Sequence, residues 1–259
     1  MAEHWLLAAA LGFLAGYLSG QFGIGGGIIT TPGIRMLLGY PELIAVGTPL
    51  PVIIPTALAG AVSYVRAGMA DTRAGLAIGV FGGAFTVLGA WLTTLVGGSF
   101  VLLVTAALIA YMAVDMIVHV IKPGESVSPT VHDERRRSWP WLGMLGAVTG
   151  LYSGFLGLGG GFIVVPLLVR LFGFPAKRAT GTSLIAVSIL AVPGTVTHYA
   201  LGNIEPTLAF ALAVGTIPGA LLGAQVTMRS SERTLRIGFA ALLIVVGVVL
   251  ALSELGVLG

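Results

Sequence analysis

The chain has 259 residues, of which 56% are hydrophobic and 9% are charged, and its mean hydropathy is +1.02. Soluble domains carry about 25% charged residues, so this composition excludes a soluble globular domain. The formal net charge of +3 comes mostly from short charged clusters between apolar stretches and gives no case for nucleic acid binding. The absence of cysteine excludes disulfides, thiolate metal sites and cysteine nucleophiles.

The apolar stretches are long enough to cross a membrane, because a bilayer core about 30 Å thick needs roughly 20 apolar residues in a helix. Two regions, Trp5 to Leu38 and Trp139 to Phe172, are broken by a triple glycine and become two short segments each. Six uninterrupted spans are predicted, at Ala45 to Val65, Ala74 to Val96, Phe100 to Ile121, Thr180 to Leu201, Pro206 to Met228 and Leu235 to Leu255. We therefore expect an all-α polytopic membrane protein of eight to ten segments, including short broken or re-entrant helices at glycine-rich tips.

The chain contains an internal repeat. Residues 16–90 align without a gap with residues 150–224, at an offset of 134, and 25 of the 75 positions are identical. Self-similarity at this level indicates duplication. We predict a first transmembrane repeat at 1–121, a cytoplasmic linker at 122–138 and a second transmembrane repeat at 139–259.

The basic residues predict that the two repeats are inverted. Loop 66–73 contains two arginines, whereas its counterpart 200–207 has no base and one glutamate. Conversely, connection 97–100 is uncharged, whereas the matching connection 229–236 carries three arginines. Short loops rich in Lys and Arg stay in the cytoplasm, so equivalent loops of the two repeats should lie on opposite sides, with both termini outside. Inverted repeats with discontinuous helices are typical of secondary transporters.

The two broken regions share the pattern Ser-Gly-x-x-Gly-x-Gly-Gly-Gly, at 19–27 and 153–161. Glycine backbone adopts positive φ and approaches a ligand closely, and a short helix after each tip would aim free N–H groups at an oxyanion. The alternative is that these glycines only allow close helix packing. Including the duplicated threonines, the candidate substrate-binding residues are Ser19, Gly23, Gly25, Gly26, Gly27, Thr48, Ser153, Gly157, Gly159, Gly160, Gly161 and Thr182.

Other polar residues allow further roles. Asp115 and His119 share a helix face and are candidates for binding a coupling proton, or for a pair that reaches water at the cytoplasmic interface. Arg35 is expected to act as an anchor at the outer interface between membrane and water. The histidines are scattered, so we expect no metal site and no cofactor. The two Ser-Gly pairs and His198 suggest an intramembrane serine enzyme, but the required Gly-x-Ser-Gly spacing is absent, and we expect no enzyme.

The doubled tip pattern is followed by Pro32 or Pro166 five residues later, then by Gly-aromatic-Pro and Gly-Thr. It resembles the TauE/SafE family of sulfite exporters and organosulfonate permeases over nearly the whole chain. The resemblance implies a small anionic sulfur compound as cargo. The positions that match the family are the two tips, Thr48 and Thr182. Pro49 stands where the second repeat has Ser183, so the site should be only approximately two-fold.

These observations predict a secondary transporter that moves sulfite or an organosulfonate across the bacterial inner (cytoplasmic) membrane by alternating access. An anion channel and a carrier of another small organic acid remain open alternatives. The expected partners are the lipid bilayer and a small anionic substrate, without nucleic acid. The sequence leaves open whether the protein forms a homodimer, which direction it transports in, and whether protons or sodium drive it.

Overall fold

The computed structural model describes the backbone of residues 2–96, 98–121 and 139–254, and the side chains of residues 4–96, 100–101, 103–112 and 139–249. All regular structure in these residues is helical, which confirms the predicted all-α class. The first repeat contains α1 (Ala2–Phe22), α2 (Gly27–Met36), α3 (Glu42–Gly47), α4 (Pro49–Arg66), α5 (Thr72–Val96) and α6 (Gly98–Ile121). The second contains α7 (Trp139–Leu156), α8 (Gly161–Phe172), α9 (Ala176–Ala200), α10 (Pro206–Arg229) and α11 (Glu232–Glu254).

Five helical segments in the described residues are long and apolar enough to cross a membrane. They are α1, α3 with α4, α5, α9 and α10. Large apolar side chains on their outward faces are exposed, among them Leu76, Val80 and Leu222, as contact with lipid requires. The chain is therefore a polytopic membrane protein. Helices α6 and α11, with 24 and 23 residues, are also of spanning length.

Both predicted breaks are present. Helix α1 ends at Phe22 and α2 begins at Gly27, while α7 ends at Leu156 and α8 begins at Gly161. Three glycines in each tip have φ between 66° and 93°, which L side chains rarely adopt, and these turns reverse the chain direction. The segments after the breaks have 10 and 12 residues, too short to span alone.

The predicted span from Ala45 to Val65 differs between the repeats. In the first repeat it is divided at Thr48 into α3 and α4, whereas the equivalent α9 is continuous. Pro49 has no N–H to donate to the carbonyl of Ala45, whereas Ser183, at the equivalent position in α9, has a backbone N–H. Because Thr48 keeps helical dihedral angles, α3 and α4 still act as one 25-residue span from Glu42 to Arg66.

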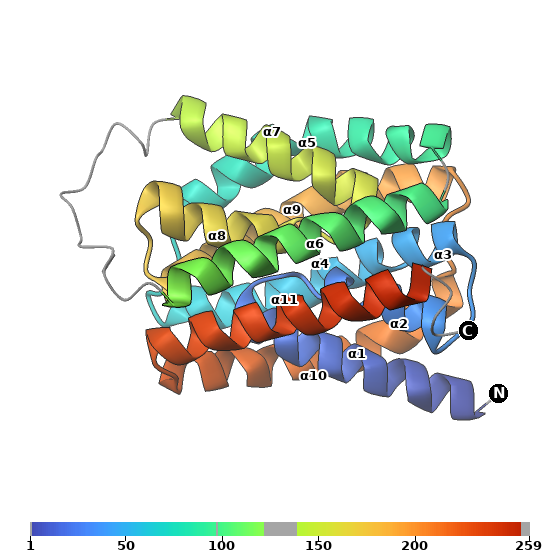
Figure 1. The fold of residues 1–259 in the computed structure, drawn as a ribbon, viewed down its shortest axis with the longest axis horizontal. Coiled ribbons are helices and arrows are strands. Elements are labelled where there is room, and N and C mark those ends of the chain that lie inside the picture. Colours follow the sequence, from blue (N-terminus) through green and yellow to red (C-terminus); the bar gives the residue numbers. More distant parts are fainter. Residues whose placement is uncertain (1, 97, 122–138, 255–259) are drawn as a thin grey trace.

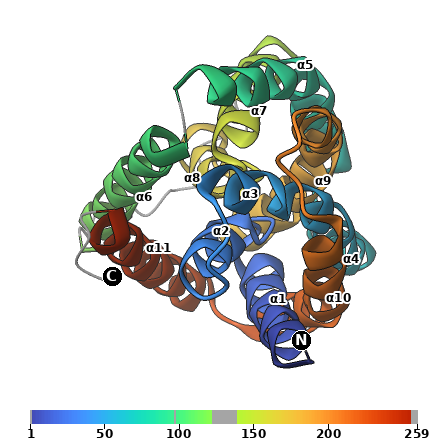
Figure 2. The same ribbon diagram turned by 90° about the vertical axis from the view of Figure 1, so that its right-hand side faces the viewer.

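The two repeats are interlocked. Helix α1 packs along α10 of the other repeat, and its counterpart α7 packs along α5 (Figure 1). Helix α4 packs against its own counterpart α9, and α6 against its counterpart α11. This pattern is unchanged when the repeats are exchanged, as a two-fold relation requires. Seen end-on, α2 and α8 lie inside a ring formed by the longer helices (Figure 2).

Close glycine contacts give the relative directions of the helices. Helix α1 is parallel to α10, because Gly12, Gly16 and Gly20 contact Leu212, Thr216 and Ala220 in that order. Helix α5 is parallel to α9, because Gly75 and Gly79 contact Ile185 and Ile189. Helix α5 is also parallel to α7, because Ile78 and Gly82 contact Gly146 and Gly150.

Helix α4 relates the direction of α1 and α10 to the direction of α5, α7 and α9. It is antiparallel to α9, since its Leu50 lies near Gly194 and its Gly60 near Leu184. Helix α10 begins beside Thr48, at the start of α4, and ends beside the end of α1, where Tyr64 of α4 also lies. Helices α1, α4 and α10 therefore run opposite to α5, α7 and α9, and each of α1, α4 and α5 runs opposite to its own counterpart.

One end of the molecule collects the basic turns. Arg178 pairs with Asp71 at 2.9 Å, and the Lys177 ammonium donates to the Met228 carbonyl at 3.0 Å. The Glu232 carboxylate accepts the Ala176 N–H at 2.6 Å. These contacts bring residues 71–73, 176–178 and 228–232 together, as expected if all three face the same side of the membrane. The opposite end holds the first residues of α1 and the last of α11 (Figure 1).

Candidate functional site

The two glycine tips meet at the centre of the molecule. A Cβ at Gly27 would lie 2.7 Å from the Leu158 Cα of the other tip, and one at Gly161 would contact the backbone of Gly23 and Ile24. Cβ positions at Gly25 and Gly159 both contact the same two side chains, those of Ile53 and Val187. Only glycine fits at these positions.

The depth of the tips follows from Ile53 and Val187. Ile53 is eleven residues from the start of the span Glu42–Arg66, and Val187 is eleven residues from the start of Ala176–Ala200. Both spans have 25 residues, so both side chains lie near their middle. Residues 22–34 and 156–166 are buried throughout. The tips therefore form a closed region at mid-depth, where exposed backbone polar groups are tolerated only if they have partners or line a cavity.

The carbonyl groups at the end of α1 have partners. The Tyr64 hydroxyl of α4 donates to the Gly20 carbonyl at 2.9 Å. The Thr227 hydroxyl of α10 donates to the Gln21 carbonyl at the same distance. These side chains replace the intrahelical N–H donors that the helix break removes.

The second repeat satisfies its carbonyl groups at the equivalent positions. His198 Nε2 donates to the Gly154 carbonyl at 3.0 Å, and the Thr93 hydroxyl donates to the Phe155 carbonyl at 3.2 Å. The offset of 134 relates His198 to Tyr64 and Thr93 to Thr227. Sequence reasoning did not find these four donors, although four polar side chains at repeat-related positions were a usable signal.

The first backbone donors of α2 and α8 are free. The residues that precede α2 and α8, Gly26 and Gly160, are left-handed and supply no side-chain cap. Within the described part of the chain, the backbone N–H groups of the two residues that follow each of them donate to no protein acceptor. Two helix N-termini with free donors therefore lie at mid-depth.

The tip serines add two further free donors. The hydroxyls of Ser19 and Ser153 are fully buried and, among the described residues, have no hydrogen-bond partner. Ser19 Cβ lies 3.8 Å from the Cβ position of Gly26, and Ser153 Cβ lies 3.4 Å from that of Gly160. Each serine therefore faces the start of the short helix in its own repeat. Thr31, on α2, carries a third buried hydroxyl without a partner, and the equivalent residue is Val165.

Thr48 and Thr182 lie near the tips, since Val46 and Thr180 contact Gly157 and Gly23, but their hydroxyls pair with turns of the other repeat. The Thr182 hydroxyl accepts the Asp71 N–H at 2.9 Å, and the Thr48 hydroxyl accepts the Glu205 N–H at 3.1 Å. Both hydroxyls thus hold the turn that enters the next long helix of the other repeat. Ser183, beside Thr182, donates to the Gly23 carbonyl at 2.8 Å, a contact that Pro49 cannot make in the first repeat.

The other predicted polar residues are not at the tips. Arg35 pairs with Glu42 at 2.7 Å, at the end opposite the basic turns. Asp115 and His119 lie in α6, but their side chains are outside the described residues, so their proton-coupling role stays a prediction. Among the described side chains, no group of three His, Asp or Glu could hold a metal ion.

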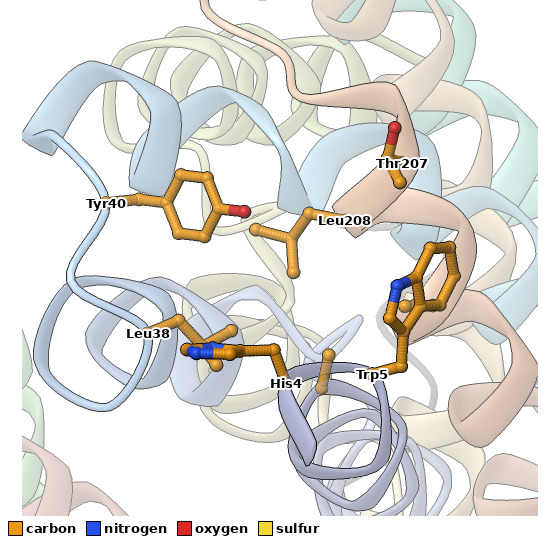
Figure 3. Close-up of a pocket in the computed structure, with 8 residues that line it drawn as sticks. His4, Trp5, Leu38, Tyr40, Thr207 and Leu208 are labelled. Carbon is orange, nitrogen blue, oxygen red and sulfur yellow. The ribbon is translucent and has the colours of Figure 1, made fainter. Parts of the chain in front are cut away.

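A small cavity lies at the end of the molecule where α1 and α10 begin. Its volume is about 70 Å³, and it is lined by residues that include His4, Trp5, Tyr40 and Thr207 (Figure 3). Pockets for small-molecule ligands have volumes of about 300–1,000 Å³, so this cavity is small for such a site. None of its lining residues belongs to a tip.

The comparisons with known proteins agree with this architecture. The chain is 27% identical to the probable membrane transporter protein YunE of Bacillus subtilis, over 94% of this chain and 96% of that protein. It is 26% identical to a probable membrane transporter protein of Methanocaldococcus jannaschii, over 95% of each chain. No solved structure matches. The model of the sulfite exporter TauE/SafE family matches residues 8–250, and the chain therefore belongs to that family.

Proposed function

We propose that the protein is a secondary transporter that moves a small sulfur-containing oxyanion, sulfite or an organosulfonate, across the cytoplasmic membrane by alternating access. The substrate would bind between the two tips, on Ser19, Ser153, the glycines of both tips and the first N–H groups of α2 and α8. The family and the names of its relatives support transport, and the tip chemistry supports an anion.

The observation that carries this proposal is the group of free hydrogen-bond donors at the helix breaks. The carbonyls of Gly20 and Gly154 are capped by side chains, while the hydroxyls of Ser19 and Ser153 and the helix N-terminal N–H groups remain free. An oxyanion offers several acceptors, and each could replace a lost water by one of these donors.

Alternating access fits the closed state of the tips. At the basic end the turn before α5 is held by Thr182 and Arg178 of the other repeat, and at the opposite end the turn before α10 is held by Thr48. We call each of these two sets of contacts a closure, and each closure joins the two repeats. Rocking of one repeat against the other would open one closure while the other stays intact, with the tips at the pivot.

Uptake into proteoliposomes tests this function. Radiolabelled sulfite and a radiolabelled sulfonate would be offered to vesicles of the purified protein, with and without the same unlabelled anion inside. We expect saturable uptake that is accelerated by internal anion, and a strong reduction in the double variant Ser19→Ala with Ser153→Ala. Linear flux without saturation would indicate a channel, and no flux of either anion would contradict the proposed substrate.

A further inference from the structure

One arginine of α11 has a buried atom without a partner. Among the described side chains, four buried nitrogen or oxygen atoms form no hydrogen bond. Three of them are the hydroxyls of Ser19, Thr31 and Ser153, and the fourth is Nε of Arg236. A buried donor of a charged group is costly to leave unpaired, so an acceptor would lower this cost at Arg236 as it would at the tip serines.

The acidic groups at this end of the molecule bind other donors. Glu232 lies one helical turn before Arg236, and its carboxylate accepts backbone N–H groups at the start of α9. Asp71 pairs with Arg178. Among the described residues, neither acid forms an ion pair with Arg236, so the guanidinium has no counter-ion there.

Arg236 lies on the inward face of α11, close to the first tip. Phe239, three residues later, shares this face and is 3% exposed, whereas Ile237 is 45% exposed. The Phe239 ring stacks on that of Phe22, with 5.6 Å between the ring centroids. Phe22 ends α1 and directly precedes Gly23, the first left-handed glycine of the tip. Arg236 is therefore one helical turn from a side chain that contacts the first tip.

Along α11, Arg236 lies between the basic end of the molecule and this tip. The helix begins at the basic end with Glu232, and Arg236 and Phe239 follow about one and two turns later. The Arg236 side chain as a whole is partly exposed, although its Nε is buried. The offset of 134 relates Arg236 to Leu102, so the equivalent position of the first repeat holds an apolar residue.

We infer that Arg236 binds the oxyanion on the basic side of the tips, as a further binding residue of the transport route. This inference rests on the proposed function. A guanidinium presents parallel N–H groups that match two oxygens of an oxyanion, and the Nε–H is one of these donors. Because Leu102 stands at the repeat-related position, the route on the opposite side lacks this charge, and the two routes are chemically different.

Binding of methanesulfonate, a small sulfonate with one negative charge, tests this role. The shift in Tm of the detergent-purified protein with methanesulfonate concentration gives the affinity. We expect Arg236→Gln to weaken the affinity about 10-fold, as for the loss of a hydrogen bond to a charged group. Arg236→Lys keeps the charge and should recover part of this loss. Arg233→Gln is the matched control, because Arg233 is an exposed arginine of the same helix, and its affinity should be unaltered.

Two further measurements separate anion binding from a structural role. Without anion, Arg236→Gln should unfold at the same temperature as Arg233→Gln or at a higher one, because the buried Nε has no partner to lose. In proteoliposomes, the sulfite concentration that gives half-maximal uptake should rise about 10-fold, with a smaller change in the maximal rate. A lower Tm with unaltered affinity would make Arg236 structural and overturn the inference.

The remaining outcomes distinguish this inference from the proposed function. Weaker binding in the double variant Ser19→Ala with Ser153→Ala, but unaltered binding in Arg236→Gln, would overturn the role of Arg236 and support the tips as the site. Stabilisation by phosphatidylglycerol that Arg236→Gln loses, with unaltered affinity for methanesulfonate, would assign the guanidinium to a lipid headgroup and also overturn the inference. No methanesulfonate binding and no sulfite uptake by the unaltered protein would contradict the proposed function and, with it, this role.

Discussion

At the residue scale, the polar side chains around the two helix breaks fall into two groups with different roles. Tyr64, His198, Thr93 and Thr227 satisfy the carbonyls, while Ser19 and Ser153 stay without partners. A buried hydroxyl without a partner costs stability unless a ligand pairs with it. The first group should therefore affect folding, and the serines should affect binding.

The serine prediction concerns Ser19→Ala and Ser153→Ala. Hydrogen bonds to charged groups contribute about 1.5–3 kcal/mol, so each variant should bind methanesulfonate roughly 10-fold more weakly or worse. Without anion, Tm should be unchanged or slightly higher, because an unpaired buried hydroxyl is removed. Thr105→Val is the control, since that buried hydroxyl already donates to the Val101 carbonyl and lies in α6. A lower Tm with unaltered binding would make the serines structural.

The carbonyl prediction concerns Tyr64→Phe. The variant leaves the Gly20 carbonyl buried without a donor, which should cost about 1–3 kcal/mol of unfolding free energy. Tyr199→Phe is the matched control, because Tyr199 is 67% exposed. Denaturant unfolding in detergent would measure both. Equal stability of the two variants would show that the Tyr64 hydroxyl does not support the end of α1.

At the element scale, close helix pairs hold the fold together. Gly12, Gly16 and Gly20 of α1 face α10, and Gly146, Gly150 and Gly154 of α7 face α5 at the equivalent positions. Lipid is as apolar as these helices, so contact between small residues has to supply the association. The glycines within α1 and α7 therefore serve packing, whereas the glycines with positive φ after these helices allow the chain to turn.

Two adjacent glycines of α5 test this packing. A Cβ at Gly82 would lie 2.5 Å from both the Gly146 carbonyl oxygen and Leu190 Cδ2, whereas the nearest atom to a Cβ at Gly83 is Pro193 Cγ at 3.7 Å. Gly82→Ala should destabilise the protein by about 1–3 kcal/mol through overpacking. Gly83→Ala should be neutral, or stabilising by up to about 1 kcal/mol through helix propensity. Similar thermal unfolding of the two variants would contradict the packing of α5 on α7.

At the scale of the whole molecule, the opposite directions of the repeats predict opposite faces for equivalent loops. Thr72 at the start of α5 and Thr207 at the start of α10 are both exposed. The chain has no cysteine, so a single cysteine at either position can be labelled alone. We expect an impermeant maleimide to label Thr207→Cys from outside intact cells and Thr72→Cys only after the membrane is opened. Labelling of both from one face would refute the inverted arrangement.

The sequence predicted much of the helical layout. Composition required a membrane protein, and the uninterrupted apolar stretches recur as long helices near the predicted residues. The triple glycines also predicted both breaks. The division at Thr48 was missed, since Pro49 and Ser183 act on the backbone differently within stretches of similar hydropathy.

By itself, then, the sequence determined which segments are helical and where they break, because hydropathy and glycine act locally along the chain, and the internal repeat with its basic loops also predicted the inversion. It could not decide that α1 pairs with α10 or that Tyr64 caps the Gly20 carbonyl. In lipid every face of a span is apolar, so no periodic pattern marks its partner. Thr48 and Thr182 likewise resembled tip residues until the fold placed their hydroxyls on the Glu205 and Asp71 N–H groups. Only the tertiary structure decided which polar groups find partners, because the partners of these side chains lie 44 to 206 residues away in the sequence.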